Sequence, residues 1–143
     1  MAIDDWRLAY IKTEDIDNYW GWLGNWLNRA LERAPSDMTI DQIYEYATQD
    51  RLRLWLVLDG DVPEAVFVTG EQPDGTLDIF AMAGRRMTQW MPVLIEPFAQ
   101  MAKASGMTRF RMAGRKGWLN VLKNIGYVQT GTDGDRILME RVL

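Results

Sequence analysis

Apolar residues recur every three or four positions between residues 15 and 34, a spacing that predicts a helix with one apolar face. Polar residues at 13–15 provide a cap and an acidic first turn, and Pro35 ends the segment. The expected core stripe of this helix consists of Ile16, Trp20, Leu23, Leu27 and Leu31.

Short apolar runs bounded by turn residues predict strands at 6–11, 54–58, 65–69, 76–83 and 107–112. The middle three should form an antiparallel meander. Two further helices are expected at about 40–49, capped by residues 37–39, and at 88–105. The inward-facing residues expected on the latter helix are Val93, Leu94, Phe98 and Met101.

The composition excludes several kinds of chemistry. The chain has 143 residues and contains neither cysteine nor histidine, which excludes disulfides, zinc-thiolate sites and Cys-His or Ser-His nucleophiles. We therefore expect no metal site, and any general base must be Asp, Glu, Tyr, Lys or water.

The net charge of −4 argues against a general binder of nucleic acid or of anionic membranes, because such a binder carries a basic surface. No apolar run approaches the ~18 residues of a membrane span, and the acidic N-terminus lacks the apolar core of a signal peptide. We therefore expect a protein that is made in a cytoplasm and either works there or is packaged from it.

The last third of the chain carries the most specific pattern. A short helix ends at Gly126, because glycine adopts left-handed dihedrals without strain. Tyr127 then opens a strand, and Asp133-Gly134 is a tight turn into a last strand at 136–143. The pair Gly126-Tyr127, followed by Gly131, resembles the end of the GCN5-related N-acetyltransferase (GNAT) fold.

The order of the expected elements, β-α-α-β-β-β-α-β-α-β-β, also agrees with that fold over nearly the whole chain. The resemblance implies one α+β domain over residues 1–143, with a mixed, mostly antiparallel twisted sheet and helices on both faces.

In GNAT proteins, coenzyme A lies where the fourth and fifth strands separate, and its pyrophosphate binds a Gln/Arg-x-x-Gly-x-Gly/Ala loop. The corresponding stretch here is 84–91, and neither arginine in it restores the motif. A motif starting at Arg86 has Gln89 and Met91 at the small positions, and one starting at Arg85 has Thr88 and Trp90 there. Arg85, Arg86 and Thr88 are the candidate coenzyme ligands, since guanidinium groups pair with phosphates.

The resemblance also locates the family's catalytic tyrosine, which protonates the leaving thiolate. Counted back from Gly126, this position holds Leu122, which has no proton to donate. Trp118 occupies a position where the family has alanine. The candidates for an acid or base are Glu71, Asp78 and Tyr127, each of which is also compatible with a structural role.

Two further groups of residues suggest an interface. Tyr19, Trp22 and Trp26 lie beside the core stripe of the first helix, where they either widen an internal contact or form a docking surface. A basic cluster is either a solvated surface or a site for an anionic partner, and it consists of Arg109, Arg111, Arg115 and Lys116.

These observations lead to three hypotheses. The first is a GNAT-fold protein without conventional catalysis or bound cofactor, which contacts other proteins as an internal virion or head–tail component of a tailed bacteriophage. This chain is similar to such small virion proteins in its missing phosphate loop and its Gly-Tyr ending. The second is an acetyl-CoA-dependent N-acetyltransferase with an atypical loop, and the third is a binding module for an anionic partner. The oligomeric state and any acceptor remain open.

Overall fold

A computed structural model describes residues 5–33 and 38–143. Its strands are β1 (Trp6–Ile11), β2 (Arg53–Asp59), β3 (Val62–Glu71), β4 (Thr76–Gly84), β5 (Arg109–Gly114), β6 (Val128–Asp133) and β7 (Arg136–Val142). Its α-helices are α1 (Ile16–Arg33), α2 (Ile40–Thr48), α3 (Met87–Ala104) and α4 (Trp118–Leu122), and short 3₁₀ turns cover Thr13–Asp15 and Lys123–Ile125. The predicted order of elements is confirmed.

The seven described strands form one sheet in the order β1-β2-β3-β4-β5-β7-β6. Every neighbouring pair is antiparallel except β4 and β5, which run parallel. The predicted mixed, mostly antiparallel sheet is therefore confirmed.

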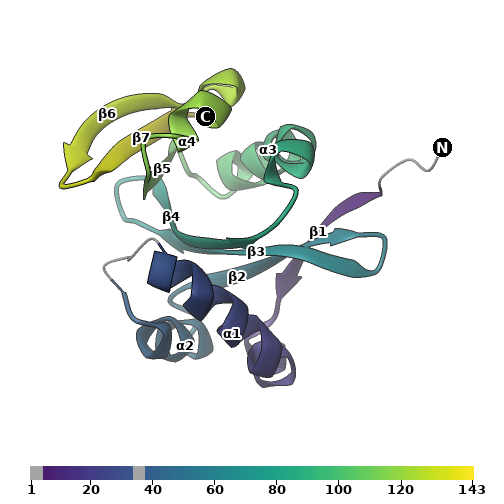
Figure 1. The fold of residues 1–143 in the computed structure, drawn as a ribbon. Coiled ribbons are helices and arrows are strands. Elements are labelled where there is room, and N and C mark those ends of the chain that lie inside the picture. Colours follow the sequence, from purple (N-terminus) through teal and green to yellow (C-terminus); the bar gives the residue numbers. More distant parts are fainter. Residues whose placement is uncertain (1–4, 34–37) are drawn as a thin grey trace.

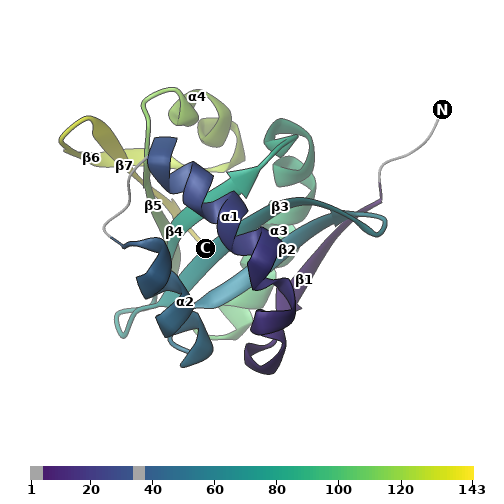
Figure 2. The ribbon, with the colours of Figure 1, turned by 60° about the horizontal axis from the view of Figure 1, so that its bottom comes forward.

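Helices cover both faces of this sheet, with α1 and α2 on one side and α3 and α4 on the other (Figures 1 and 2). The core under α1 and α2 is mainly aliphatic and includes Leu23, Leu27, Ile43, Leu54 and Val66. The core under α3 is rich in aromatic rings and includes Trp55, Phe67, Trp90, Phe98 and Phe110. Neighbouring rings in this second core lie 5.2–6.3 Å apart. Two of the seven tryptophans are buried in it, and Trp6 and Trp118 pack against it partly buried.

Local signals in the sequence place several element ends correctly. Thr39 caps α2 in a reciprocal capping box with Gln42, which satisfies first-turn amides of the helix. Gly126, with φ +92°, stops the turn after α4 as expected, and β6 begins at Val128, one residue later than predicted. Pro35 and Asp37, expected to end α1 and help cap α2, lie outside the described residues.

The predicted inward faces are correct for α1 and partly wrong for α3. On α1, Ile16, Leu23 and Leu27 are buried, while Trp20 and Leu31 are partly buried against the same core. On α3, Leu94 and Phe98 are buried, but Val93 and Met101 are 54% and 41% exposed. The buried face of α3 instead lies along Trp90, Met91, Leu94, Ile95, Phe98, Ala99 and Ala102.

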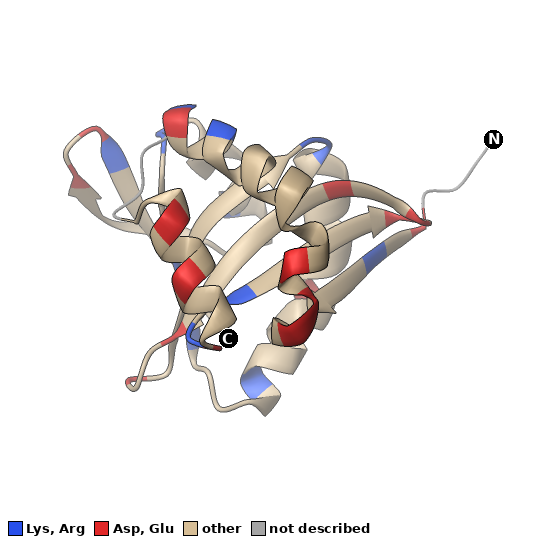
Figure 3. Cartoon of the chain, turned by 90° about the horizontal axis from the view of Figure 1, so that it is seen from below, with Lys and Arg blue, Asp and Glu red and all other residues tan. Residues whose placement is uncertain are grey.

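Charged residues of both signs are distributed over the helices and strands seen from the side of α1 and α2 (Figure 3). Among the described helices, none is both long and apolar enough to cross a membrane.

Candidate functional site

The parallel strands β4 and β5 separate partway along their length. They pair from Thr76 opposite Arg109 to Ile79 opposite Met112, after which β4 continues to Gly84 and β5 to Gly114 without pairing to each other. A β-bulge at Phe80 lies where the strands part, since Thr69 of β3 faces Ile79 and Val68 faces Ala81. A bulge bends and twists its strand, which accounts for the divergence of β4 from β5 at this point.

A cavity of about 80 Å³ occupies this opening, which we call the splay. The two diverging strands form its walls, and Leu31 of α1 and Trp118 of α4 close it. Trp118 lies directly over Gly114, where an added Cβ would be 3.3 Å from the indole ring. The bulky residue that the sequence places at position 118 thus narrows the splay.

The loop from β4 to α3 lies at the far end of this opening. Gly84 has φ +130°, and an added Cβ would overlap the backbone of Glu64 and Ala65, so the position requires glycine. Arg86 adopts a left-handed conformation as the N-cap of α3, a rare state for a residue with a side chain.

The two arginines of this loop differ in their surroundings. Arg85 pairs with the buried carboxylate of Glu64 at 2.7 Å, but its side chain is 68% exposed. Arg86 is more enclosed: it contacts Asp59 at 2.9 Å and lies over the ring of Trp6 at 4.6 Å. Arg85 therefore presents its charge beside the N-terminus of α3, whereas Arg86 ties the loop to β1 and β2. Thr88 is exposed in the first turn of α3.

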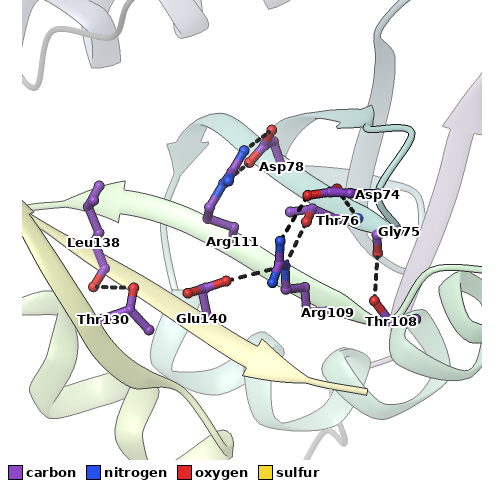
Figure 4. Close-up of polar contacts among 10 residues, drawn as sticks. All are labelled: Asp74, Gly75, Thr76, Asp78, Thr108, Arg109, Arg111, Thr130, Leu138 and Glu140. Carbon is purple, nitrogen blue, oxygen red and sulfur yellow. Dashed lines mark hydrogen bonds and ion pairs between the residues drawn. The ribbon is translucent and has the colours of Figure 1, made fainter.

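The predicted basic cluster is divided in the structure. Arg109 contacts Thr76 at 2.6 Å, Asp74 at 2.9 Å and Glu140 at 3.3 Å (Figure 4). Its neighbour on the same face of β5, Arg111, donates two hydrogen bonds to Asp78, at 2.6 and 2.9 Å. Carboxylates from β7 and from β4 with its preceding turn thus surround both arginines.

These contacts shift the proton affinities of two groups in the network. Hydrogen bonds from Thr76, followed by the charges of Arg109 and Arg111, lower the pKa of Asp74. The hydrogen-bonded carboxylate of Asp78 raises the pKa of Arg111. Arg115 and Lys116, the other members of the predicted cluster, are exposed in the turn before α4 and form no ion pair within the described residues.

A cleft of about 280 Å³ adjoins the splay on the α1 side of the sheet. Asp78 and Arg111 line it from β4 and β5, Arg136 and Leu138 line it from β7, and Phe80 borders both the cleft and the splay cavity. The cleft therefore leads from solvent, past the Asp78–Arg111 pair, to the point where the strands part.

The other acid or base candidates lie elsewhere. Tyr127 is buried on the α3 side and borders a small apolar cavity together with Leu122 and Met112. Burial strongly raises the pKa of its phenol, so Tyr127 keeps its proton at neutral pH. Glu71 pairs with Arg53 at 3.2 Å at the end of β3, near the start of β4 and away from the splay.

The three aromatic residues singled out on the first helix form a row along α1. Ring centroids of Tyr19 and Trp22 are 6.3 Å apart, and those of Trp22 and Trp26 are 6.1 Å apart. Tyr19 and Trp22 are exposed, whereas Trp26 packs partly against the aliphatic core. We call these residues the α1 aromatic row.

Comparison with known proteins gives a consistent result for the fold. The chain matches no protein-family model and no curated protein sequence. Among solved structures, it is similar to a putative N-acetyltransferase from Lactobacillus plantarum, with a TM-score of 0.70 and 15% identity, over 98% of this chain and 99% of that one. The chain has the GNAT fold.

Two further GNAT-fold structures support this result. An IAA acetyltransferase from Bacillus cereus is 18% identical, with a TM-score of 0.67, over 97% of this chain and 100% of that one. The PaiA N-acetyltransferase from Thermoplasma acidophilum, in complex with coenzyme A, is 12% identical, with a TM-score of 0.64, over 97% and 99%. The expected fold is thus confirmed over nearly the whole chain.

Sequence reasoning identified one residue of the splay and missed others. Trp118 was singled out through the family pattern, and it closes the cavity. Phe80 was missed because its position in an apolar strand gave no indication of a bulge. Leu31 was assigned to the core stripe of α1, and only the packing of that helix over β4 brings it to the splay.

Proposed function

We propose that this protein is an acyl-coenzyme A-dependent N-acyltransferase with an atypical pyrophosphate loop. The observation that carries the proposal is the separation of parallel strands β4 and β5 beside the N-terminus of an 18-residue helix. The similar solved structures carry acetyltransferase names, and one of them contains coenzyme A.

The residues at the start of α3 fit the phosphates of the coenzyme. The first amides of a helix have no acceptor within the helix and attract anions, and α3 has no acidic residue in its first turn. Arg85 adds an exposed guanidinium beside these amides. Thr88, in the first turn of the helix, offers a hydroxyl on the exposed side.

The splay fits the acyl end of the coenzyme. Beyond the bulge, β4 is paired with β3 along one edge, and its other edge faces the opening, where backbone groups are available to an extended ligand. Trp118 and Leu31 leave space for a small acyl group only. When bound, the coenzyme supplies this group as an activated thioester.

The protein's own residues act chiefly by positioning in this proposal. The cleft beside the splay receives the acceptor amine, and the Asp78–Arg111 pair at its wall orients the polar part of the acceptor. Leu122 cannot protonate a leaving thiolate, and the buried Tyr127 holds its proton firmly. Placing the amine and the acyl carbon in contact is itself a large source of rate enhancement.

Calorimetric titration with acetyl-CoA tests the proposal. We expect micromolar binding, equivalent to about −8 kcal/mol, which Arg85→Gln weakens about tenfold. Lys103→Gln, at the other end of the same helix, removes an exposed positive charge as a control and should leave binding unchanged. Absence of both binding heat and a thermal shift at millimolar acetyl-CoA would contradict the proposal.

A second candidate function is a non-catalytic component of an assembly, such as an internal or head–tail component of a tailed-phage virion. The α1 aromatic row, in which Tyr19 and Trp22 are exposed, favours it, because tryptophan and tyrosine are enriched in interface cores. This function requires that Trp22→Ala or Trp26→Ala weaken incorporation into the particle, while acetyl-CoA binding is absent. Quantifying the protein in purified particles provides that measurement.

A further inference from the structure

A pocket of about 260 Å³ lies on the α3 side of the sheet, apart from the splay. It is lined near the start of β4 by Leu77, whereas the splay opens beyond Ile79. Strand β2 begins and strand β3 ends beside this pocket, which we call the lateral pocket. The proposed acyltransfer reaction does not use it.

The pairing of three strands builds the floor of the lateral pocket. Tyr10 of β1 lies opposite Trp55 of β2, and Arg53 of β2 lies opposite Thr69 of β3. Because alternate residues of a strand share a face, Arg53 and Trp55 both point to the α3 side. The register thus sets two aromatic rings, 5.4 Å apart, next to one guanidinium group.

The C-terminal half of α3 forms the roof. Phe98 packs edge-on against Trp55 at 5.2 Å and closes the inner end of the lateral pocket. At the outer end, Tyr10 and Met101 are each 41% exposed, so two large apolar side chains remain accessible at the rim. The interior is consequently apolar and largely aromatic, with an entrance between β1 and α3.

The polar groups at the lateral pocket are mainly hydrogen-bond donors. The Thr69 hydroxyl accepts a hydrogen bond from the Trp55 indole at 2.9 Å and donates its own proton to no acceptor within the described residues. Arg53 contacts Glu71 through Nη1 alone, whereas a guanidinium group carries five N–H donors. Glu71 engages this guanidinium group through Oε1 only, so the remaining N–H donors of Arg53 and the hydroxyl proton of Thr69 favour a ligand that offers acceptor oxygens.

We propose that the lateral pocket binds a small planar apolar monocarboxylate. The ring lies between the aromatic floor and α3, and the carboxylate faces Arg53 and Thr69. The volume is below the 300–1,000 Å³ typical of sites for drug-sized ligands, which limits the ligand to about one or two fused rings. This proposal is independent of coenzyme binding.

Three probes of the same shape and different charge test the proposal: 2-naphthoate, the neutral 2-naphthamide, and the cationic 2-naphthylmethylammonium. Titration followed by two-dimensional NMR reports the site directly, because the Trp55 indole N–H donates to Thr69 inside the lateral pocket. We expect 2-naphthoate to bind at least tenfold more tightly than the amide, to shift the Trp55 indole signal, and to leave that of Trp118 unchanged. The ammonium probe should not bind.

Matched variants separate specific recognition from general attraction of anions. Arg53→Gln should weaken 2-naphthoate binding at least tenfold. Arg51→Gln removes the same charge two residues away, where the guanidinium lies over Tyr46 outside the lateral pocket, and should have no effect. Met101→Glu, at the exposed rim, should abolish binding without changing the core. Thermal unfolding checks that each variant is folded.

Several results would overturn the proposal. These are no binding of 2-naphthoate, equal effects of Arg53→Gln and Arg51→Gln, tighter binding of the ammonium probe, or shifts confined to residues outside the lateral pocket. Binding that survives Met101→Glu would also place the ligand elsewhere.

Discussion

At the scale of single residues, Gly84 determines how the loop between β4 and α3 is built. Its lack of a Cβ lets the loop pack against the backbone of β3, and the amide of Arg85 then donates to the carbonyl of Glu64 at 3.0 Å. This contact brings Arg85 and Arg86 to the buried carboxylate of Glu64. One glycine therefore positions both arginines of this loop, including Arg85 of the proposed phosphate site.

Replacing Gly84 with alanine should destabilise the protein by about 2 kcal/mol or more, because the new Cβ meets backbone atoms and the dihedral is strained. Gly21→Ala, inside α1 with no atom near the added Cβ, is the matched control and should stabilise by about 0.5–1 kcal/mol. Urea unfolding of both variants measures the difference. Effects of the same sign would show that Gly84 does not pack against the backbone of β3.

Tyr127 provides a prediction about alkaline pH. Because burial raises its pKa in the folded state, the unfolded chain loses this proton first, near pH 10. The associated stability is fully present below pH 10 and is lost as the pH rises above it. The unfolding free energy of the wild type should thus fall between pH 9.5 and 11 relative to that of Tyr127→Phe. Parallel curves for the two proteins would contradict the burial of this phenol.

Residue-scale chemistry was only partly predictable from the sequence. Strand alternation correctly put Arg109 and Arg111 on one face of β5, but it gave no information about their partners. Asp74, Asp78 and Glu140 come from distant segments, and only the register of β4, β5 and β7 brings them together. Pairing across strands is not encoded in local periodicity, so the cluster could not be recognised as an ion-pair network.

At the scale of elements, predictions succeeded where a local signal was strong and failed where apolar residues occupied more than one face of an element. The boundaries of β1 were predicted to the residue, and a capping residue fixed the start of α2. Helix α3 carries apolar residues on more than one face, including Val93 and Met101, so its pattern could not define which face meets the sheet. Packing against the aromatic core decided that face instead.

The short helix α4 gives an element-scale prediction that depends on the proposed function. Trp118 closes the splay, so Trp118→Ala should enlarge the acyl site and raise the ratio of kcat/KM for butyryl-CoA to that for acetyl-CoA about tenfold. Trp22→Ala, at an exposed position of α1, is the control and should leave the ratio unchanged. An unaltered ratio in a folded Trp118→Ala protein would mean that the acyl group does not contact this ring.

At the scale of the whole molecule, two cores of different character share one sheet. Strands β2 and β3 contribute alternate residues to each core, with Leu54 and Val66 facing α1 and Trp55 and Phe67 facing α3. Loss of either helix layer therefore exposes one face of the same strands whose other face forms the second core. The sheet therefore couples the two cores mechanically.

This coupling predicts a single cooperative unfolding transition. Leu27→Ala in the aliphatic core and Phe98→Ala in the aromatic core should each cost about 3–5 kcal/mol and shift the whole transition together. Far-ultraviolet circular dichroism and tryptophan fluorescence, recorded on the same samples, measure this. Separate transitions for the two probes in either variant would show that the cores unfold independently.

The bulge at Phe80 has a consequence for how this chain can change in length. Ile79 and Met82 face the α3 core although they are three positions apart, whereas Ala81 and Ala83 face the other side. The extra residue thus shifts the alternation of inward and outward side chains by one position for the rest of β4. Deleting Phe80 would remove the bulge and restore strict alternation, with Ile79 and Met82 still facing α3 and Ala81 and Ala83 still facing the other side. Because the bulge bends β4 away from β5, we expect homologues that lack this one residue to keep both cores but to have a straighter β4 and a narrower splay.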